Sequence, residues 1–311
     1  MSFVWPSEAR AQQPAKPYRI GILSLLKRPS EDVFRDAMRD LGYVEGKSLV
    51  YETRYAEGHA DRLAALAADL VRLRVDVIVT AGGPASEAAK AATASVPIVL
   101  WGAGDPIGIG LVTDVSHPGG NITGVTELST ELTAKRLQLF KEAVPGLKRI
   151  AVIWNAGDHA MSLRFREVEA AAPGLGLGVI PLPVQALDDF DASFETMARD
   201  RPDGILVVTD AMTRLKEGAL FEFARSQRLP TMFEFPPSAH DGGLISYGPS
   251  LAELAPRAAA FVDKILKGAK PGDLPLESPV HWHLVVNLRT AKAIGIAVPF
   301  AIIARADEVI E

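Results

Sequence analysis

The chain has 311 residues, 48% of them hydrophobic and 23% charged, which is the balance of a globular protein long enough for two domains. The net charge of −5 gives no electrostatic case for nucleic acid, and no apolar run is long enough to span a membrane. The absence of cysteine excludes thiol catalysis, disulfides and cysteine-ligated metal sites.

Residues 1–17 share no pattern with the rest of the chain, and we interpret them as a leader. Ala9-Arg10-Ala11 before Gln12 places small residues where signal peptidase requires them, so the motif predicts export to the periplasm. The charged and apolar regions that should precede the motif are missing, which indicates a signal peptide truncated at its front. The alternative is a ragged cytoplasmic N-terminus.

Strands and helices alternate from residue 18 onward. Ser30 is expected to cap the first helix, and Gly42 to end it. The first-half elements are strands at 18–24, 49–55, 76–81 and 97–101 and helices at 33–41, 63–73 and 84–92. Short β-branched strands separated by amphipathic helices predict a parallel sheet covered on both faces.

The segment 102–124 is rich in glycine and proline and is expected to be mostly loop. After it, the alternation starts again. The expected strands are 149–155, 178–183, 204–209, 231–234, 244–247 and 280–286, and helices end near 172 and 227, carry Phe190, Phe194 and Met197, and cover 251–266 and 288–294. The fold class is therefore α/β with two similar open sheets, and ligands are expected beyond the carboxyl ends of their strands.

Short motifs in order along nearly the whole chain carry a resemblance to a known family. They are GYVEGK at 42–47, DRL at 61–63, DVIV at 76–79, AAKAAT at 88–93, DP at 105–106, PGGNITG at 118–124, KRL at 135–137, VIWN at 152–155, GLISYGP at 243–249, VDKILKG at 262–268 and ARADEV at 304–309. With these motifs the chain resembles the ABC transporter substrate-binding proteins of the tryptophan- and tyrosine-binding type. One departure leaves the ligand's identity open: Asn155 is followed by Ala156-Gly157-Asp158, where the family often has a proline-containing segment.

The resemblance implies a type I periplasmic-binding fold, with two Rossmann-like lobes, a three-crossing hinge and a ligand cleft between the lobes. The expected N-lobe comprises 18–125 and 248–278, and the expected C-lobe comprises 126–247 and 279–311. It also explains the Ala-Arg-Ala leader, because proteobacterial members often carry a similar signal end.

The turn after the third strand is the first candidate binding site. Gly82 and Gly83 permit close backbone approach, and a helix starting at Pro84 presents free N–H groups that favour a carboxylate. Ser86 offers a hydroxyl in the first turn, and Ser24 ends the first strand at the equivalent place. The alternatives are an ordinary βα turn and a serine bonded to its own backbone.

Polar and aromatic residues also follow other strands. Trp101, Asp105 and Pro106 follow the fourth strand, and Asp105 is a candidate for the ligand's amino group or for an Asx-turn. In the second half, Asn155 and Asp210 are candidates for a positive or polar ligand group, although Asp210 could equally cap the next helix. Glu234 and Phe235 end a further strand, where an aromatic ring could stack on the ligand or belong to the core.

Thr126, Ser246 and Gly248 lie where we place the lobe crossings and are the expected hinge residues, and Tyr247 between them is a further ligand candidate. His281 and His283 could share one strand face, but no third ligand accompanies them, so we expect no metal site.

We therefore predict a periplasmic substrate-binding protein of an ABC importer that captures a carboxylate-bearing amino acid or aromatic acid by hinge closure. It is expected to be a monomer without cofactor or enzymatic activity, with its ligand and an ABC permease as partners, and without nucleic acid or membrane insertion. The alternatives are a ligand-sensing domain of a signalling system and a Rossmann-like enzyme. Residues 1–17 are too short for a DNA-binding head, and the chain has no dinucleotide fingerprint, P-loop lysine motif or Gly-x-Ser-x-Gly elbow.

Overall fold

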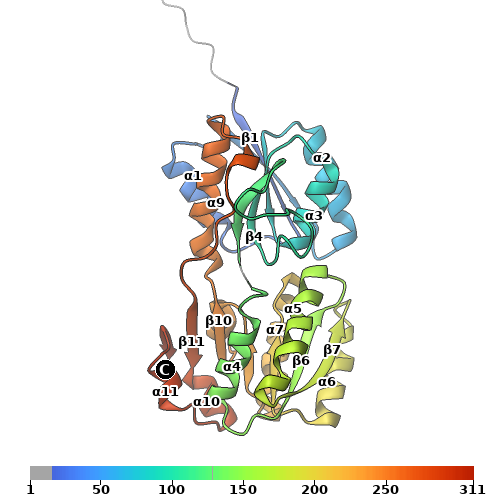
Figure 1. The fold of residues 1–311 in the computed structure, drawn as a ribbon, viewed down its shortest axis with the longest axis vertical. Helices are drawn as coiled ribbons and strands as arrows, with labels where there is room; N and C mark the ends of the chain where they lie inside the picture. Colours follow the sequence, from blue (N-terminus) through green and yellow to red (C-terminus); the bar gives the residue numbers. More distant parts are fainter. Residues whose placement is uncertain (1–15, 128) are drawn as a thin grey trace, which may run out of the picture.

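The computed structural model describes residues 16–127 and 129–311, and it shows two α/β lobes arranged one above the other (Figure 1). The Ala9-Arg10-Ala11 motif and nearly all of the expected leader lie outside the described residues. Within the described ranges, no helix combines the length and the apolar character that crossing a bilayer requires.

The N-lobe is built on a five-stranded parallel sheet in the order β2-β1-β3-β4-β5. Its strands are β1 (Tyr18–Ser24), β2 (Leu49–Tyr55), β3 (Val77–Ala81), β4 (Ile98–Ala103) and β5 (Ile122–Thr126), and its helices are α1 (Glu31–Asp40), α2 (Leu63–Arg72), α3 (Gly83–Ala92) and, from later in the chain, α9 (Leu251–Leu266). Alternate residues of the strands point to opposite faces. Ile20, Val79 and Trp101 pack with α1 and α9, whereas Leu23 and Ile78 belong to the cluster that includes α2 and α3.

The C-lobe contains a seven-stranded sheet in the order β12-β11-β10-β9-β8-β6-β7. Its strands are β6 (Arg149–Asn155), β7 (Gly178–Val184), β8 (Gly204–Val207), β9 (Thr231–Phe233), β10 (Ile245–Gly248), β11 (His283–Asn287) and β12 (Glu308–Ile310), and its helices are α4 (Thr133–Ala143), α5 (His159–Ala171), α6 (Asp189–Asp200), α7 (Ala211–Gln227), α8 (Pro236–His240), α10 (Leu288–Ile294) and α11 (Phe300–Ile303). All neighbouring strands pair in parallel except β11, which returns from the N-lobe antiparallel to β10.

The strand β5 begins inside the segment that we expected to be loop, so that expectation was wrong at its C-terminal end. Gly124 in the middle of β5 looks like a strand breaker in the sequence. In the structure its φ is 129°, and a Cβ at this position would lie 2.3 Å from the backbone oxygen of Leu100. Glycine is therefore required because β5 approaches β4 too closely for a side chain.

The chain passes between the lobes three times, after β5, after β10 and before β11 (Figure 1). The first and third passages lie side by side, because Thr126 N donates to the Glu277 backbone oxygen at 2.8 Å and Glu277 N donates to that of Gly124 at 2.9 Å. Two lobes with parallel sheets and a three-crossing hinge confirm the predicted fold class.

Candidate functional site

The two lobes meet at a surface that we call the lobe junction, formed by Leu25, Gly83 and Ile109 of the N-lobe and Asp158 and Met161 of the C-lobe. Gly83 follows β3 and Asp158 follows β6, so the carboxyl ends of the two sheets face each other here. A Cβ placed on Gly83 would lie 3.5 Å from Ile109 Cδ1 and 3.9 Å from Asp158 Oδ1. The lobes are therefore in direct contact at the edge where the sequence predicts ligand binding.

The candidate turn 82–86 lies on the N-lobe side of the lobe junction. Gly82 is the N-cap of α3 with a φ of 91°, and no side chain caps this helix. Pro84 lies in the first turn, and the buried Ser86 hydroxyl donates to the Gly82 backbone oxygen at 2.7 Å and contacts Thr80 Oγ1. The Ser24 hydroxyl likewise donates to a nearby backbone oxygen, that of Leu26, at 2.7 Å. The two serine hydroxyls donate locally, whereas the helix end is uncapped.

The candidates that follow β4 divide into two groups. Trp101 is buried on the α1 and α9 face, where its ring stacks on Phe34 with centroids 5.5 Å apart and its Nε1 donates to Leu251 O. Asp105 accepts from Gly108 N at 2.7 Å, which is an Asx-turn, and the backbone oxygen of Pro106 accepts from the loop that follows. The structure thus gives Trp101 a place in the N-lobe core and Asp105 a role in its loop.

On the C-lobe side, Asn155 and Asp210 are brought together: Asn155 Nδ2 donates to Asp210 Oδ2 at 2.7 Å. Asp210 also forms a capping box with Thr213 at the start of α7. Sequence reasoning did not single out Asp158, which caps α5 by accepting from Ala160 N at 2.8 Å and is buried at the lobe junction.

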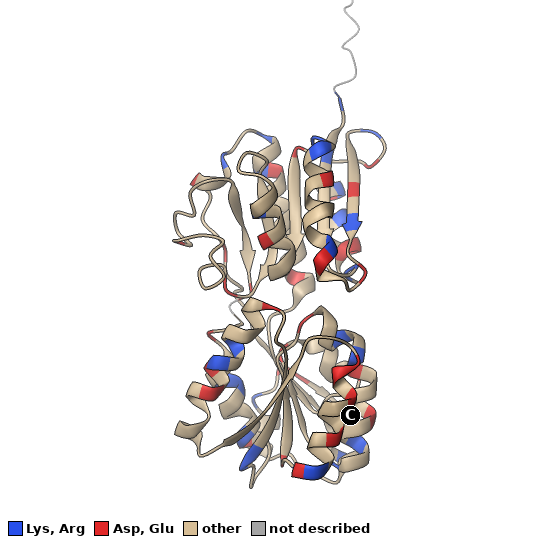
Figure 2. Ribbon diagram, turned by 90° about the vertical axis from the view of Figure 1, so that its right-hand side faces the viewer, with Lys and Arg blue, Asp and Glu red and all other residues tan. Residues whose placement is uncertain are grey.

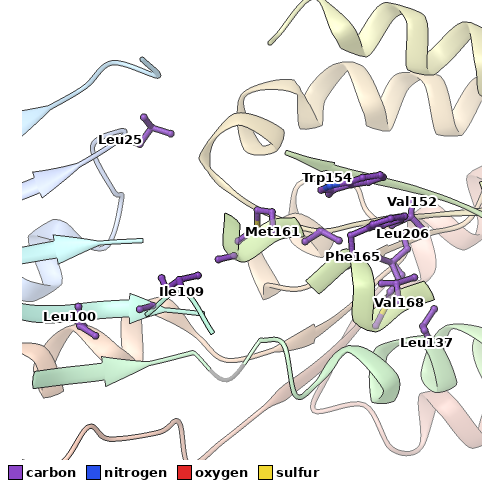
Figure 3. Close-up of a cluster of buried hydrophobic side chains, with 14 of the residues drawn as sticks. Leu25, Leu100, Ile109, Leu137, Val152, Trp154, Met161, Phe165, Val168 and Leu206 are labelled. Carbon is purple, nitrogen blue, oxygen red and sulfur yellow. The ribbon is translucent and has the colours of Figure 1, made fainter. Parts of the chain in front are cut away.

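One hydrophobic cluster continues across the lobe junction. It contains Leu25 and Ile109 from the N-lobe and Met161, Trp154 and Phe165 from the C-lobe (Figure 3). The Trp154 and Phe165 rings stack with centroids 3.5 Å apart. An apolar lining of this kind suits a ligand with an apolar or aromatic side chain.

Beside this cluster, buried charges alternate through the hinge. Arg136 Nη1 donates to Glu234 Oε1 at 3.2 Å, Arg164 Nη1 donates to Glu234 Oε2 at 2.6 Å, and Arg164 Nη2 donates to Glu127 Oε2 at 3.2 Å. All four side chains are at most 6% exposed. Burial raises the pKa of Glu127, and Arg164 opposes that rise. Arg136 is completed by the backbone oxygens of Tyr247 and Ser129.

The predicted hinge residues surround this charge chain. Thr126 ends β5 immediately before Glu127, and the buried Ser246 and the half-buried Tyr247 lie on β10. Gly248 fits where a Cβ would lie 2.0 Å from the Glu234 backbone oxygen. The structure places the predicted Glu234 inside the chain as the partner of two arginines, and the neighbouring Phe235 is buried.

Arg28, which the sequence reasoning missed, reaches the lobe junction from the segment between β1 and α1. Its guanidinium carbon lies 5.6 Å from the centroid of the Trp101 ring, and its Nη2 would be 3.7 Å from a Cβ on Gly82. Desolvation by burial lowers the pKa of Arg28, and the charge of Glu127 opposes this change. The segment carries no periodic signal that distinguishes Arg28 from the adjacent, exposed Lys27.

The expected absence of a metal site concerned His281 and His283. His283 Nε2 lies 2.9 Å from Glu253 Oε1. Among the described residues, no group of three potential ligand side chains is placed to hold a metal ion. Lys, Arg, Asp and Glu are interspersed over the helices of both lobes in Figure 2.

We expect Asp158 to make stability depend on pH. Burial, and secondarily the charge of Asp210, raise the pKa of Asp158 to about 6. Because the folded state holds this proton more tightly than the unfolded state, its contribution is present below about pH 4 and is lost as the pH rises through 6. Asp158→Asn keeps an N-cap residue but has no such proton. Relative to wild type, its free energy of unfolding should increase by about 1–3 kcal/mol between pH 4 and pH 7.5. Urea unfolding at both pH values measures this, and a difference that does not change with pH would contradict it.

Comparison with known proteins agrees with this architecture. The family described as ABC transporter substrate binding protein matches residues 19–310. A tyrosine-binding protein of Clostridioides difficile (strain R20291) is 25% identical over 293 residues, which cover 93% of this chain and 84% of that protein.

Two solved structures are similar over nearly the whole chain. The crystal structure of a conserved domain protein from Vibrio cholerae has a TM-score of 0.89 and 26% identity, covering 94% of this chain and 100% of that one. The ABC domain from Streptococcus pneumoniae in complex with L-Trp has a TM-score of 0.87 and 25% identity, covering 95% of this chain and 100% of that one.

Proposed function

The chain belongs to the family of ABC transporter substrate binding proteins, and on that premise we propose that it captures an amino acid or an aromatic acid between its two lobes. The observation that carries the proposal is the lobe junction itself. The uncapped N-terminus of α3 lies there, opposite the polar residues that follow β6, and an apolar cluster lies beside both. A helix N-terminus favours a carboxylate, and an apolar lining favours an aromatic or aliphatic side chain.

The ligand class is supported by the two relatives whose names state a ligand. One is a tyrosine-binding protein and the other was crystallised with L-Trp, and both ligands combine a carboxylate with an aromatic ring. The stacked Trp154 and Phe165 belong to the same apolar cluster as Met161 at the lobe junction. An aromatic amino acid therefore fits the charge and the polarity on both sides of this surface.

The proposed mechanism is hinge closure. The lobes contact each other in this structure, so a ligand must enter when they separate at the three crossings and must then be held by both lobes. We propose that the closed, loaded form acts in the periplasm and is recognised by the permease of an ABC importer. The ligand is bound and released without chemical change, so the function calls for no cofactor.

Ligand screening tests this function. The unfolding temperature should rise with L-tryptophan, L-tyrosine or an aromatic acid, because a ligand of the folded state alone adds about 2.7 kcal/mol at one hundred times its Kd. Calorimetric titration of the best candidate gives the affinity, and D-arabinose serves as a control without a carboxylate. A shift with the sugar and none with any acid would overturn the proposed ligand class.

A further inference from the structure

We infer that Arg28 binds the carboxylate of the ligand, so that the site selects acids over amines that carry the same ring. This inference rests on the proposed function and adds to it a specific residue and a rule of ligand selection. Three observations at the lobe junction carry it: an unpaired buried nitrogen, an alternating chain of charges, and an uncapped helix end next to the same guanidinium.

The first observation is the environment of the Arg28 side chain. Nη1 is buried from solvent and has no hydrogen-bond partner among the described residues. On one side the guanidinium faces the ring of Trp101, which attracts a cation but accepts no conventional hydrogen bond. A buried guanidinium nitrogen without an acceptor is costly, and an anionic oxygen is the acceptor that compensates best.

The second observation is the order of the charges. From the hinge outward the side chains are Arg136, Glu234, Arg164, Glu127 and then Arg28, so a cation stands at each end of the chain. At one end, two backbone oxygens complete Arg136. At the other end, Arg28 is influenced by the charge of Glu127, which already forms an ion pair with Arg164. Three guanidinium groups and two carboxylates leave one positive charge for an incoming anion.

The third observation is the position of α3. Arg28 Nη2 lies beside Gly82, the N-cap of this helix, where no side chain takes up the capping position. The free N–H groups at the start of α3 and the Arg28 guanidinium thus converge on one place. A carboxylate there accepts from both, in the two-sided manner that favours planar anions over neutral groups.

Calorimetry on the full chain tests the assignment with L-tryptophan and L-tyrosine and with tryptamine and tyramine, which lack the carboxylate. Arg28→Gln should weaken binding of both amino acids roughly 10- to 150-fold, the range for lost hydrogen bonds to a charged group. Lys27→Gln, an equal charge change at the exposed neighbouring position, should leave their affinity unchanged. Wild type should bind both amines more weakly than the acids, and Arg28→Gln should not weaken amine binding further.

Wild-type affinity of Arg28→Gln for the acids, or an equal loss for acids and amines, would overturn the role of Arg28 and leave the proposed function standing. If wild type binds none of the four compounds, the proposed ligand class fails instead. The thermal unfolding of the ligand-free protein gives a separate readout. Because Arg28→Gln removes a buried charge that lacks a full partner, the unfolding temperature should stay the same or rise, and a clear fall would show that Arg28 serves the fold.

Discussion

Replacing Arg164 by alanine is expected to lower the free energy of unfolding by about 3–5 kcal/mol, because it leaves buried carboxylates without their common partner. Arg164 bonds Glu234 at 2.6 Å and Glu127 at 3.2 Å, and it is 1% exposed. Its removal also opens space beside Gly104, where a Cβ would overlap the guanidinium. Arg164→Met, which keeps much of the volume, separates the loss of charge from the loss of packing.

Urea unfolding of these variants should be compared with that of Arg166→Ala, which changes an exposed residue on the same helix and should shift stability by no more than about 0.5 kcal/mol. Adding Glu127→Gln to Arg164→Met should recover part of the loss, since one of the stranded charges is then gone. Burial raises the pKa of Glu127, and the loss of Arg164 raises it further. The folded variant therefore gains protons as the pH falls, so its deficit should be smaller at pH 5 than at pH 8. Equal stability of Arg164→Ala and wild type would show that the charge chain is not essential to the fold.

The order of strands and helices could be predicted from the sequence because apolar periodicity is local. Strands such as β1 and β3 are short β-branched runs, and helices such as α1 have an apolar stripe. The expectation was wrong at β5, where Gly124 reflects a close approach to Leu100 that no local pattern encodes. The segment at Ser30 shows a smaller difference: this residue occupies the N-cap position of α1, but its side chain makes no capping hydrogen bond.

The candidate site was only partly predictable. Rules about strand ends located Gly83, Asn155 and Asp210 at the facing edges of the sheets. They gave Trp101 the same weight, although side-chain alternation along β4 directs it into the core. The arginines of the charge chain were missed, yet a signal was present: Arg164 lies three residues after Met161 and four before Val168, so a charged residue occupies the apolar face of α5. Its partners, Glu127 and Glu234, come from distant parts of the chain, and only the tertiary structure brings them together.

Gly83→Val is expected to weaken ligand binding roughly 10- to 150-fold while both lobes still fold, since overfilling a packed site costs about 1–3 kcal/mol. Gly83 does not have a positive φ, so its backbone accepts a side chain. The first carbon fits, because it would lie 3.5 Å from Ile109 Cδ1 and 3.6 Å from the Cβ of Ala160. The two further methyl groups of valine would have to occupy the lobe junction, in the space between the start of α3 and the C-lobe.

A graded series makes the cause of this loss measurable. Gly83→Ala adds only the carbon that fits, so its affinity for L-tryptophan or L-tyrosine should stay within a few-fold of wild type. Gly174→Val adds the same bulk as Gly83→Val at an exposed glycine with no heavy atom within 4 Å of its Cβ position, and it should bind normally. If valine at 83 lowers the unfolding temperature of the ligand-free protein as much as it lowers affinity, the substitution damages the N-lobe itself. Wild-type affinity in Gly83→Val would show that the ligand is held away from the start of α3, because a loaded, closed junction there has no room for the added methyl groups.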